Sequence, residues 1–163
     1  MEASQAESKS YVKPGLLHTQ EYVGMVAAAV LLLSLFLPWY TTSDNPNSKL
    51  NGQSGINTSA WEQFAILDWL LVAACAAPFI LSWIVARGHK LSWRPGEVTA
   101  IVGITAVVLI LCNGIILGRP GESVEIGLTY GYAVALLGAG GILVSGFMRQ
   151  SEVAGPRKPP GEL

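Results

Sequence analysis

The spacing of charged residues constrains this chain more than any other feature, because it leaves four long stretches nearly free of charge. Residues 22–40, 98–118 and 128–148 contain no Asp, Glu, Lys or Arg, and residues 63–86 contain one such residue, Asp68. The hydrocarbon core of a bilayer, roughly 30 Å thick, requires about 20 residues of helix. The sequence therefore predicts four transmembrane helices, at about residues 22–40, 60–86, 98–118 and 128–148.

The composition supports this interpretation. Of the 163 residues, 51% are hydrophobic and 13% are charged, whereas soluble domains carry about 25% charged residues. We expect an all-α membrane protein, a four-transmembrane-helix bundle formed by residues 21–148. The flanking segments 1–20 and 149–163 are polar or rich in proline and glycine, so we expect two disordered tails.

Lysine and arginine predict the orientation of the chain. With four spans, both termini and the loop between the second and third helices lie on one side, and the opposite side carries two basic residues, Lys49 and Arg119. Because positively charged loops stay in the cytoplasm, both termini are expected there. This topology accounts for the basic residues, so the bilayer is expected as a partner and nucleic acid is not. The residues on the cytoplasmic side are Lys9, Lys13, Arg87, Lys90, Arg94, Arg149, Arg157 and Lys158.

The largest predicted element outside the membrane is an outer loop, residues 41–59. Within it, Asn51-Gly52 is typical of a tight hairpin turn. The loop ends at Ser59-Ala60-Trp61-Glu62, which fits a capping box formed by Ser59 and Glu62. A helix is therefore expected to begin near Ala60. The loop itself is either a polar cap on the bundle or a recognition element for a partner or ligand.

Asp68 is the one acid expected inside a span. Counted from the cap, it lies about eight residues, or roughly 12 Å, into a continuous second helix, in the outer leaflet. An ionised aspartate at the centre of a span costs about 2.5–3.5 kcal/mol, so Asp68 is expected to face protein or water. Asn113 on the antiparallel third helix has a similar depth. We expect a hydrogen bond between Asp68 and Asn113, with Arg119 as a second candidate partner; a proton or cation relay at Asp68 is the alternative.

Small residues recur at four-residue spacing in the last predicted helix. Such faces allow helices to approach closely in membranes. Two faces on one helix fit one contact inside the bundle and a second contact with a partner or another copy of the chain. The first face is Gly131, Ala135 and Ala139, and the second is Gly141 and Ser145.

The sequence contains no pattern typical of catalysis, a metal site or a cofactor site. Cys75 and Cys112 are expected at different depths, too far apart for a disulfide, and no CxxC is present. His18 and His89 have no ligand spacing around them. We therefore expect no metal, no cofactor and no enzymatic activity.

A run of short motifs resembles a known group of proteins. The order LPWY, a polar loop, SAWEQF and the acid of ILDWL, within residues 22–86, is similar to small, uncharacterised four-span membrane proteins of high-GC Gram-positive bacteria. The resemblance implies a bacterial plasma membrane. It implies no activity.

Two functions fit these observations. The first is a non-enzymatic structural or accessory subunit that binds another membrane protein through the fourth helix and the outer loop. The alternative is a small proton- or cation-coupled transporter, or a channel subunit, that uses Asp68. The first is favoured, because Asp68 has an expected structural partner and no second charge is expected within the spans.

Overall fold

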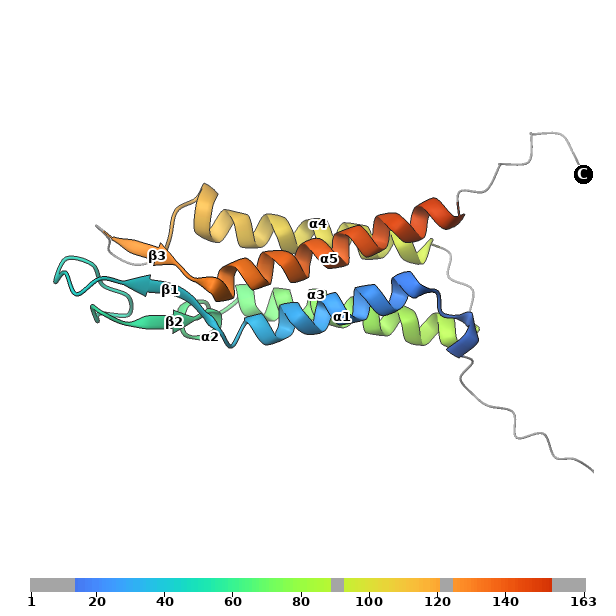
Figure 1. Cartoon of the computed structure of the whole chain (residues 1–163), viewed down its shortest axis with the longest axis horizontal. Helices are drawn as coiled ribbons and strands as arrows, with labels where there is room; N and C mark the ends of the chain where they lie inside the picture. Colours follow the sequence, from blue (N-terminus) through green and yellow to red (C-terminus); the bar gives the residue numbers. More distant parts are fainter. Residues whose placement is uncertain (1–13, 89–92, 121–124, 154–163) are drawn as a thin grey trace, which may run out of the picture.

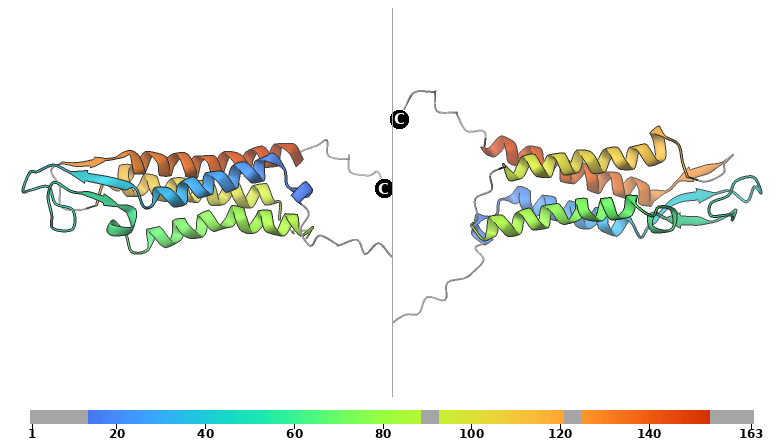
Figure 2. Two further views of the ribbon diagram at one scale, coloured as in Figure 1. Left: turned by 60° about the horizontal axis from the view of Figure 1, so that its bottom comes forward. Right: turned by 180° about the vertical axis from the view of Figure 1, so that it is seen from behind.

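Four long helices lie side by side, and a small sheet continues beyond one end of them (Figure 1). The structure, a computed structural model, describes residues 14–88, 93–120 and 125–153. The end with the sheet is called the sheet end here, and η1 and the carboxyl end of α5 lie at the opposite end (Figure 2). Most of the two predicted tails, residues 1–13 and 154–163, lies outside the described residues.

The helices and strands follow one another in a simple order. The helices are η1 (Pro14–Leu16), α1 (Thr19–Ser34), α2 (Ala60–Gln63), α3 (Leu67–Ala86), α4 (Pro95–Leu111), which continues as the π-helical turn η2 (Cys112–Ile116), and α5 (Tyr130–Val153). The strands are β1 (Pro38–Thr42), β2 (Asn57–Ser59) and β3 (Ile126–Leu128).

Three of the helices are long and apolar enough to cross a membrane. They are α3, the combined α4 and η2, and α5. The fourth apolar helix, α1, has 16 residues, about 24 Å of helix, which is less than a bilayer core of roughly 30 Å. A helical membrane protein agrees with these lengths, and a fourth span stays a prediction.

The first predicted helix, 22–40, is wrong at its carboxyl end. Helix α1 stops at Ser34, and the chain enters strand β1 at Pro38. Proline removes a backbone donor and disfavours the helical conformation of the residue before it, while the following Trp-Tyr-Thr-Thr residues favour a strand. The indole Nε1 of Trp39 donates to the Ser34 carbonyl at 2.8 Å, so a carbonyl left free at the helix end is satisfied.

The second predicted helix, 60–86, is two helices. The predicted capping box is present at Ser59 and Glu62, and the Ser59 amide donates to Glu62 Oε2 at 2.7 Å. However, α2 ends after four residues at Phe64, which is extended with φ −122° and ψ 144°. Asp68 is therefore the second residue of a new helix, α3, and not the middle of a longer one.

The all-α prediction is wrong at the sheet end. Strand β1 pairs antiparallel with both β2 and β3, in the order β2-β1-β3. The predicted tight turn at Asn51-Gly52 is confirmed, with φ of 52° and 80° and reciprocal backbone bonds between Leu50 and Gln53 of 2.9 and 3.0 Å. The sheet pairs β1, which follows α1, with β3, which precedes α5. The periodicity of apolar residues within helices does not reveal this long-range pairing.

Helix α5 is the central element, because it packs closely against both α1 and α4. Towards α1, a Cβ added to Gly138 would lie 2.7 Å from the Leu31 amide nitrogen. Towards α4, a Cβ added to Gly146 would lie 2.4 Å from the Ala100 nitrogen. The helix backbones therefore approach so closely that a methyl group does not fit.

The small residues singled out in the sequence lie within the bundle. A Cβ added to Gly131 would lie 2.3 Å from the Pro38 carbonyl oxygen, and one added to Gly141 would lie 2.8 Å from Ala27 Cβ. The second small face of α5 is thus turned towards the chain's own α1, so it is not left free for the partner contact that was expected of one of the two faces. The remaining members of the two faces, all buried, are Ala135, Ala139 and Ser145.

Two glycines two residues apart on α5 provide a test of this packing. Gly138→Ala should destabilise the bundle by about 1–3 kcal/mol, because the methyl group meets backbone atoms of Leu31 that cannot rotate away. Gly140→Ala has no heavy atom within 4 Å of the new methyl group and should be neutral, or stabilising by up to about 1 kcal/mol. Thermal unfolding in detergent measures both, and equal effects would contradict the packing.

Candidate functional site

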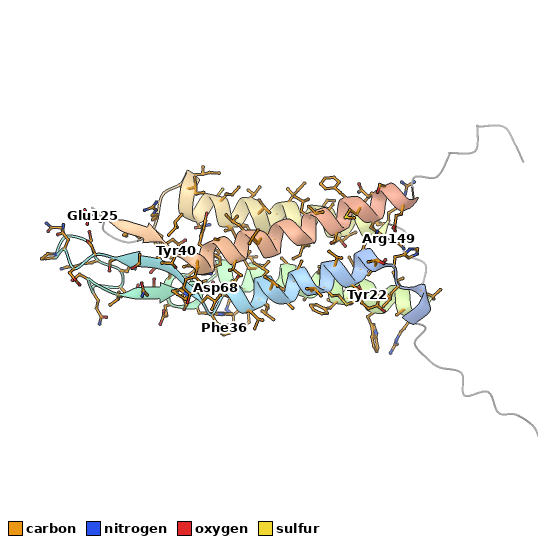
Figure 3. All side chains as sticks on the ribbon, viewed as in Figure 1. Tyr22, Phe36, Tyr40, Asp68, Glu125 and Arg149 are labelled. Carbon is orange, nitrogen blue, oxygen red and sulfur yellow. The ribbon has the colours of Figure 1, made fainter. Side chains whose placement is uncertain are left out.

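Asp68 is fully buried at the sheet end of the bundle. Its exposed fraction is 0%, and neither carboxylate oxygen has a hydrogen-bond partner among the described residues. Figure 3 places it at the junction of the helices with the sheet, near the start of α3. A buried carboxyl group without a partner is rare in proteins. The region around Asp68 is therefore a candidate functional site.

Neither predicted partner binds Asp68. The Asn113 amide Nδ2 donates to the Leu109 carbonyl of its own helix at 2.9 Å, and an Arg119 guanidinium nitrogen donates to the Ile126 carbonyl. The predicted bond between Asp68 and Asn113 is therefore wrong. Its physical reason is the π-helical turn, where Asn113 leaves helical geometry at φ −91° and ψ 23° and its side chain turns back along α4.

Two tyrosines from β1 and α5, and no described side chain from α3, bond the main chain around Asn113. The Tyr40 hydroxyl, from β1, donates to the Asn113 carbonyl, and the Tyr132 hydroxyl, from α5, donates to the Ile110 carbonyl at 2.9 Å. A π-helical turn shifts the backbone bonding register by one residue. Gly114 is required beside it, because a Cβ there would lie 2.5 Å from the Tyr132 ring.

Four aromatic side chains gather around these bonds, and we call Trp39, Tyr40, Phe64 and Tyr132 the aromatic cluster. Their ring centroids are 5.6 to 6.5 Å apart, within the range of favourable aromatic contacts. The sequence predicted no role in the site for these tryptophan and tyrosine residues. They could have been found from their chemistry, because a buried tyrosine hydroxyl or tryptophan indole N–H usually needs a hydrogen-bond partner.

Electrostatics connect the aromatic cluster to Asp68. Burial raises the pKa of the Tyr40 hydroxyl above its ordinary value; Tyr132 raises it further, Arg119 lowers it, and Asp68 raises it. Tyr40 therefore keeps its proton and its role as a donor at physiological pH. Asp68 and Tyr40 are therefore close enough to interact electrostatically.

The three hydrogen-bond donors of the aromatic cluster, on Trp39, Tyr40 and Tyr132, all bond main-chain carbonyls. Trp39 bonds the end of α1, while Tyr40 and Tyr132 bond the end of α4. None of these three donates to Asp68. The hydrogen-bond donors of these three side chains are therefore not available to Asp68.

The described residues contain no group of three or more His, Cys, Asp and Glu side chains that could hold a metal ion. The two cysteines are free, with Cys75 buried and Cys112 partly exposed.

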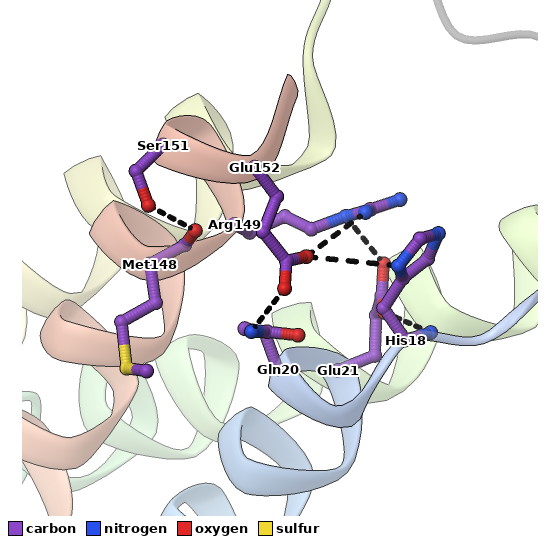
Figure 4. Close-up of polar contacts among 7 residues, drawn as sticks. All are labelled: His18, Gln20, Glu21, Met148, Arg149, Ser151 and Glu152. Atoms are coloured by element: carbon purple, nitrogen blue, oxygen red, sulfur yellow. Dashed lines mark hydrogen bonds and ion pairs between the residues drawn. The ribbon is translucent and has the colours of Figure 1, made fainter. Parts of the chain in front are cut away.

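A second set of polar side chains joins α1 and α5 at the opposite end, and Figure 4 shows it in detail. Arg149 Nε lies 2.9 Å from Glu21 Oε1, and the side chains are 15% and 8% exposed. Glu152 lies 3.6 Å from both Arg149 Nη1 and His18 Nδ1 and accepts a bond of 2.5 Å from Gln20 Nε2. We call these five residues the polar cluster.

The polar cluster corrects the predicted boundaries of both tails. Arg149 was expected in a disordered tail that begins at residue 149, but α5 continues to Val153. Helix α1 likewise begins at Thr19, inside the predicted tail 1–20. A buried ion pair contributes little net stability but is costly to break on one side, so the cluster fixes how the ends of α1 and α5 meet.

The tyrosine contacts can be tested with a pair of neighbouring residues on α5. Tyr132→Phe should lower the free energy of unfolding by about 1–3 kcal/mol, because it leaves the Ile110 carbonyl buried without a donor. Tyr130→Phe removes a hydroxyl from an exposed ring and should change stability by less than about 0.5 kcal/mol. Thermal unfolding in detergent distinguishes them, and a stable Tyr132→Phe variant would refute the role of the bond.

Comparisons of the chain with protein-family models, with curated proteins and with solved structures gave no significant match. The resemblance to small membrane proteins of high-GC Gram-positive bacteria therefore stays a prediction.

Proposed function

We propose that this chain is a non-enzymatic integral membrane protein that serves as an accessory subunit for another membrane protein. It would span a bacterial plasma membrane four times, with both termini in the cytoplasm and the sheet outside. The uneven distribution of lysine and arginine supports this orientation, and the three long apolar helices support membrane insertion. The observation that carries the proposal is an open groove between α3 and α4.

The groove follows from unequal packing of the four helices. Helix α5 packs tightly against α1 and α4, whereas α3 packs less extensively against α1 and least against α4. Both small faces of α5, one of which was expected to contact a partner or another copy, make contacts within the chain. The surface for a partner is therefore proposed on α3 and α4 instead of α5.

The lining of the groove suits another transmembrane helix. The groove has a volume of about 380 Å³, and Leu70 and Ile101 on its rim are 49% and 55% exposed. Its one hydroxyl, on Thr105, already donates to the Ile101 carbonyl at 2.8 Å. Small residues let helices approach closely in membranes, and Ala73, Ala74 and Thr105 supply them. The complete lining is Leu70, Ala73, Ala74, Ile101, Val102, Thr105 and Leu109.

The sheet end offers a second contact, outside the membrane in the proposed topology. Residues 51–55, which include the Asn51-Gly52 turn, are all exposed and contain no large apolar side chain. Behind them, Leu50 is fully buried, so the turn is held on a packed base. A polar turn on a fixed base is suited to recognising the outer part of a partner that also occupies the groove.

An alanine in the groove and an exposed alanine elsewhere provide the test. Ala73→Phe should reduce the amount of partner protein that co-purifies in mild detergent roughly tenfold, because the ring fills the space of the incoming helix. Ala133→Phe, a matched change at an exposed position of α5, should leave the yield unchanged.

A photo-crosslinking amino acid at position 73 identifies the occupant directly. A cross-link to one other membrane protein supports the accessory role. A cross-link to a second copy of the chain would replace it with a homo-oligomer, and equal loss of the partner in both phenylalanine variants would argue against the groove.

A proton- or cation-coupled transporter or channel subunit is the second candidate, and the burial of Asp68 without a partner favours it. The hydrogen bond to Asn113 that would have given Asp68 a structural role is not formed. If this function holds, proteoliposomes with the native chain show pH-driven flux, and Asp68→Asn abolishes the flux while the protein stays folded. Absence of flux with the native chain would exclude this candidate.

A further inference from the structure

The environment of Asp68 leaves its carboxyl group without a counter-charge. Four charged or titratable side chains at the sheet end bond other groups. Tyr40 of β1 and Tyr132 of α5 bond carbonyls of α4 and η2, Glu62 of α2 bonds Ser59, and Arg119, beyond η2, bonds Ile126. None of the ion pairs among the described residues includes Asp68.

The backbone of α3 does not solvate the carboxyl group either. Asp68 is the second residue of α3, where the free amides of a helix favour a negative charge. Yet the side chain accepts no amide bond, because both of its oxygens lack a partner within the described part of the chain, and no side chain caps the start of α3. Burial without a donor penalises the ionised carboxylate more than the neutral acid, since the ion depends more strongly on solvation.

We propose that Asp68 is a proton-binding site, occupied when the sheet end is packed as it is in this structure. Release of the proton would create a buried charge that must gain water or a donor. Tyr40, whose hydroxyl interacts electrostatically with Asp68, bridges β1 to η2. Proton release is therefore coupled to the contact between the sheet and the helices.

A proton fits this site better than a metal cation does. Hard cations such as Ca²⁺ take about six to eight oxygen ligands and Mg²⁺ takes about six. The described residues place no group of three or more His, Cys, Asp and Glu side chains around Asp68 that could hold a metal ion. A single buried carboxyl group requires one proton to become neutral.

Infrared spectroscopy tests the proposal on the full chain in nanodiscs of phosphatidylcholine. At neutral pH the native protein should show the carbonyl stretching band of a protonated carboxylic acid, and the band should disappear as the pH is raised. Asp68→Asn should lack the band. Asp44→Asn, the same substitution at an exposed aspartate, should retain it.

Three results would overturn the proposal. They are the absence of the band from the native protein at neutral pH, its persistence in Asp68→Asn, and its loss when sodium is added at constant pH. The last result would indicate a cation site. These measurements need no partner protein, so their outcome is independent of the accessory function.

Thermal unfolding adds a second readout on the same samples. Because the amide of asparagine has nearly the shape of a neutral carboxyl group, Asp68→Asn should unfold at the native temperature at neutral pH. Between neutral and alkaline pH, the unfolding temperature of the native protein should then fall by more than that of Asp68→Asn. Strong destabilisation of Asp68→Asn at neutral pH, together with an unchanged pH profile, would mean that the charged form is the one the fold requires.

Discussion

Three aromatic side chains hold the sheet end together by donating hydrogen bonds to main-chain carbonyls at helix ends. Trp39 bonds the end of α1, and Tyr40 and Tyr132 bond the end of α4. A broken or π-helical segment near a bilayer must satisfy its backbone groups within the protein. Because Tyr40 lies on β1 and Tyr132 on α5, these bonds also fix where the sheet lies on the helices. None of these three donors bonds Asp68, whose carboxylate oxygens have no partner among the described residues.

The glycines of α5 determine the rest of the bundle. They bring α5 against α1 and α4 so closely that the backbones touch, and the polar cluster of Glu21, Arg149 and Glu152 fixes the opposite end of the α1–α5 pair. Helix α3 has no such glycine row and is held less tightly against α4. The accessible groove between α3 and α4 is a direct consequence of this asymmetry.

The two ends of the bundle therefore differ in whether their buried acidic side chains have a counter-charge. At one end, acids and a base are paired across α1 and α5, so each buried charge has a counterpart. At the other, Asp68 is buried and its carboxylate oxygens have no partner among the described residues, while Tyr40 and Tyr132 bond main-chain carbonyls. A paired acid fixes the positions of the helices. Gain or loss of a proton at an unpaired buried acid instead changes the stability of the packing around it. This contrast is why the proposed proton site is Asp68 and not the polar cluster.

The sequence by itself determined the apolar helices, the start of α2 at the Ser59 capping box and the turn at Asn51-Gly52, because each depends on local composition or on residues a few positions apart. It did not determine the sheet, the break at Phe64 or the partners of Asp68 and Asn113. Strand pairing between Tyr40 and Leu128 joins residues far apart in the chain, and Phe64 leaves the helix where its ring meets Trp39 and Tyr40. Equal depth on neighbouring helices suggested that Asp68 and Asn113 would bond, but the π-helical turn redirected Asn113, and only the tertiary structure decides such a direction.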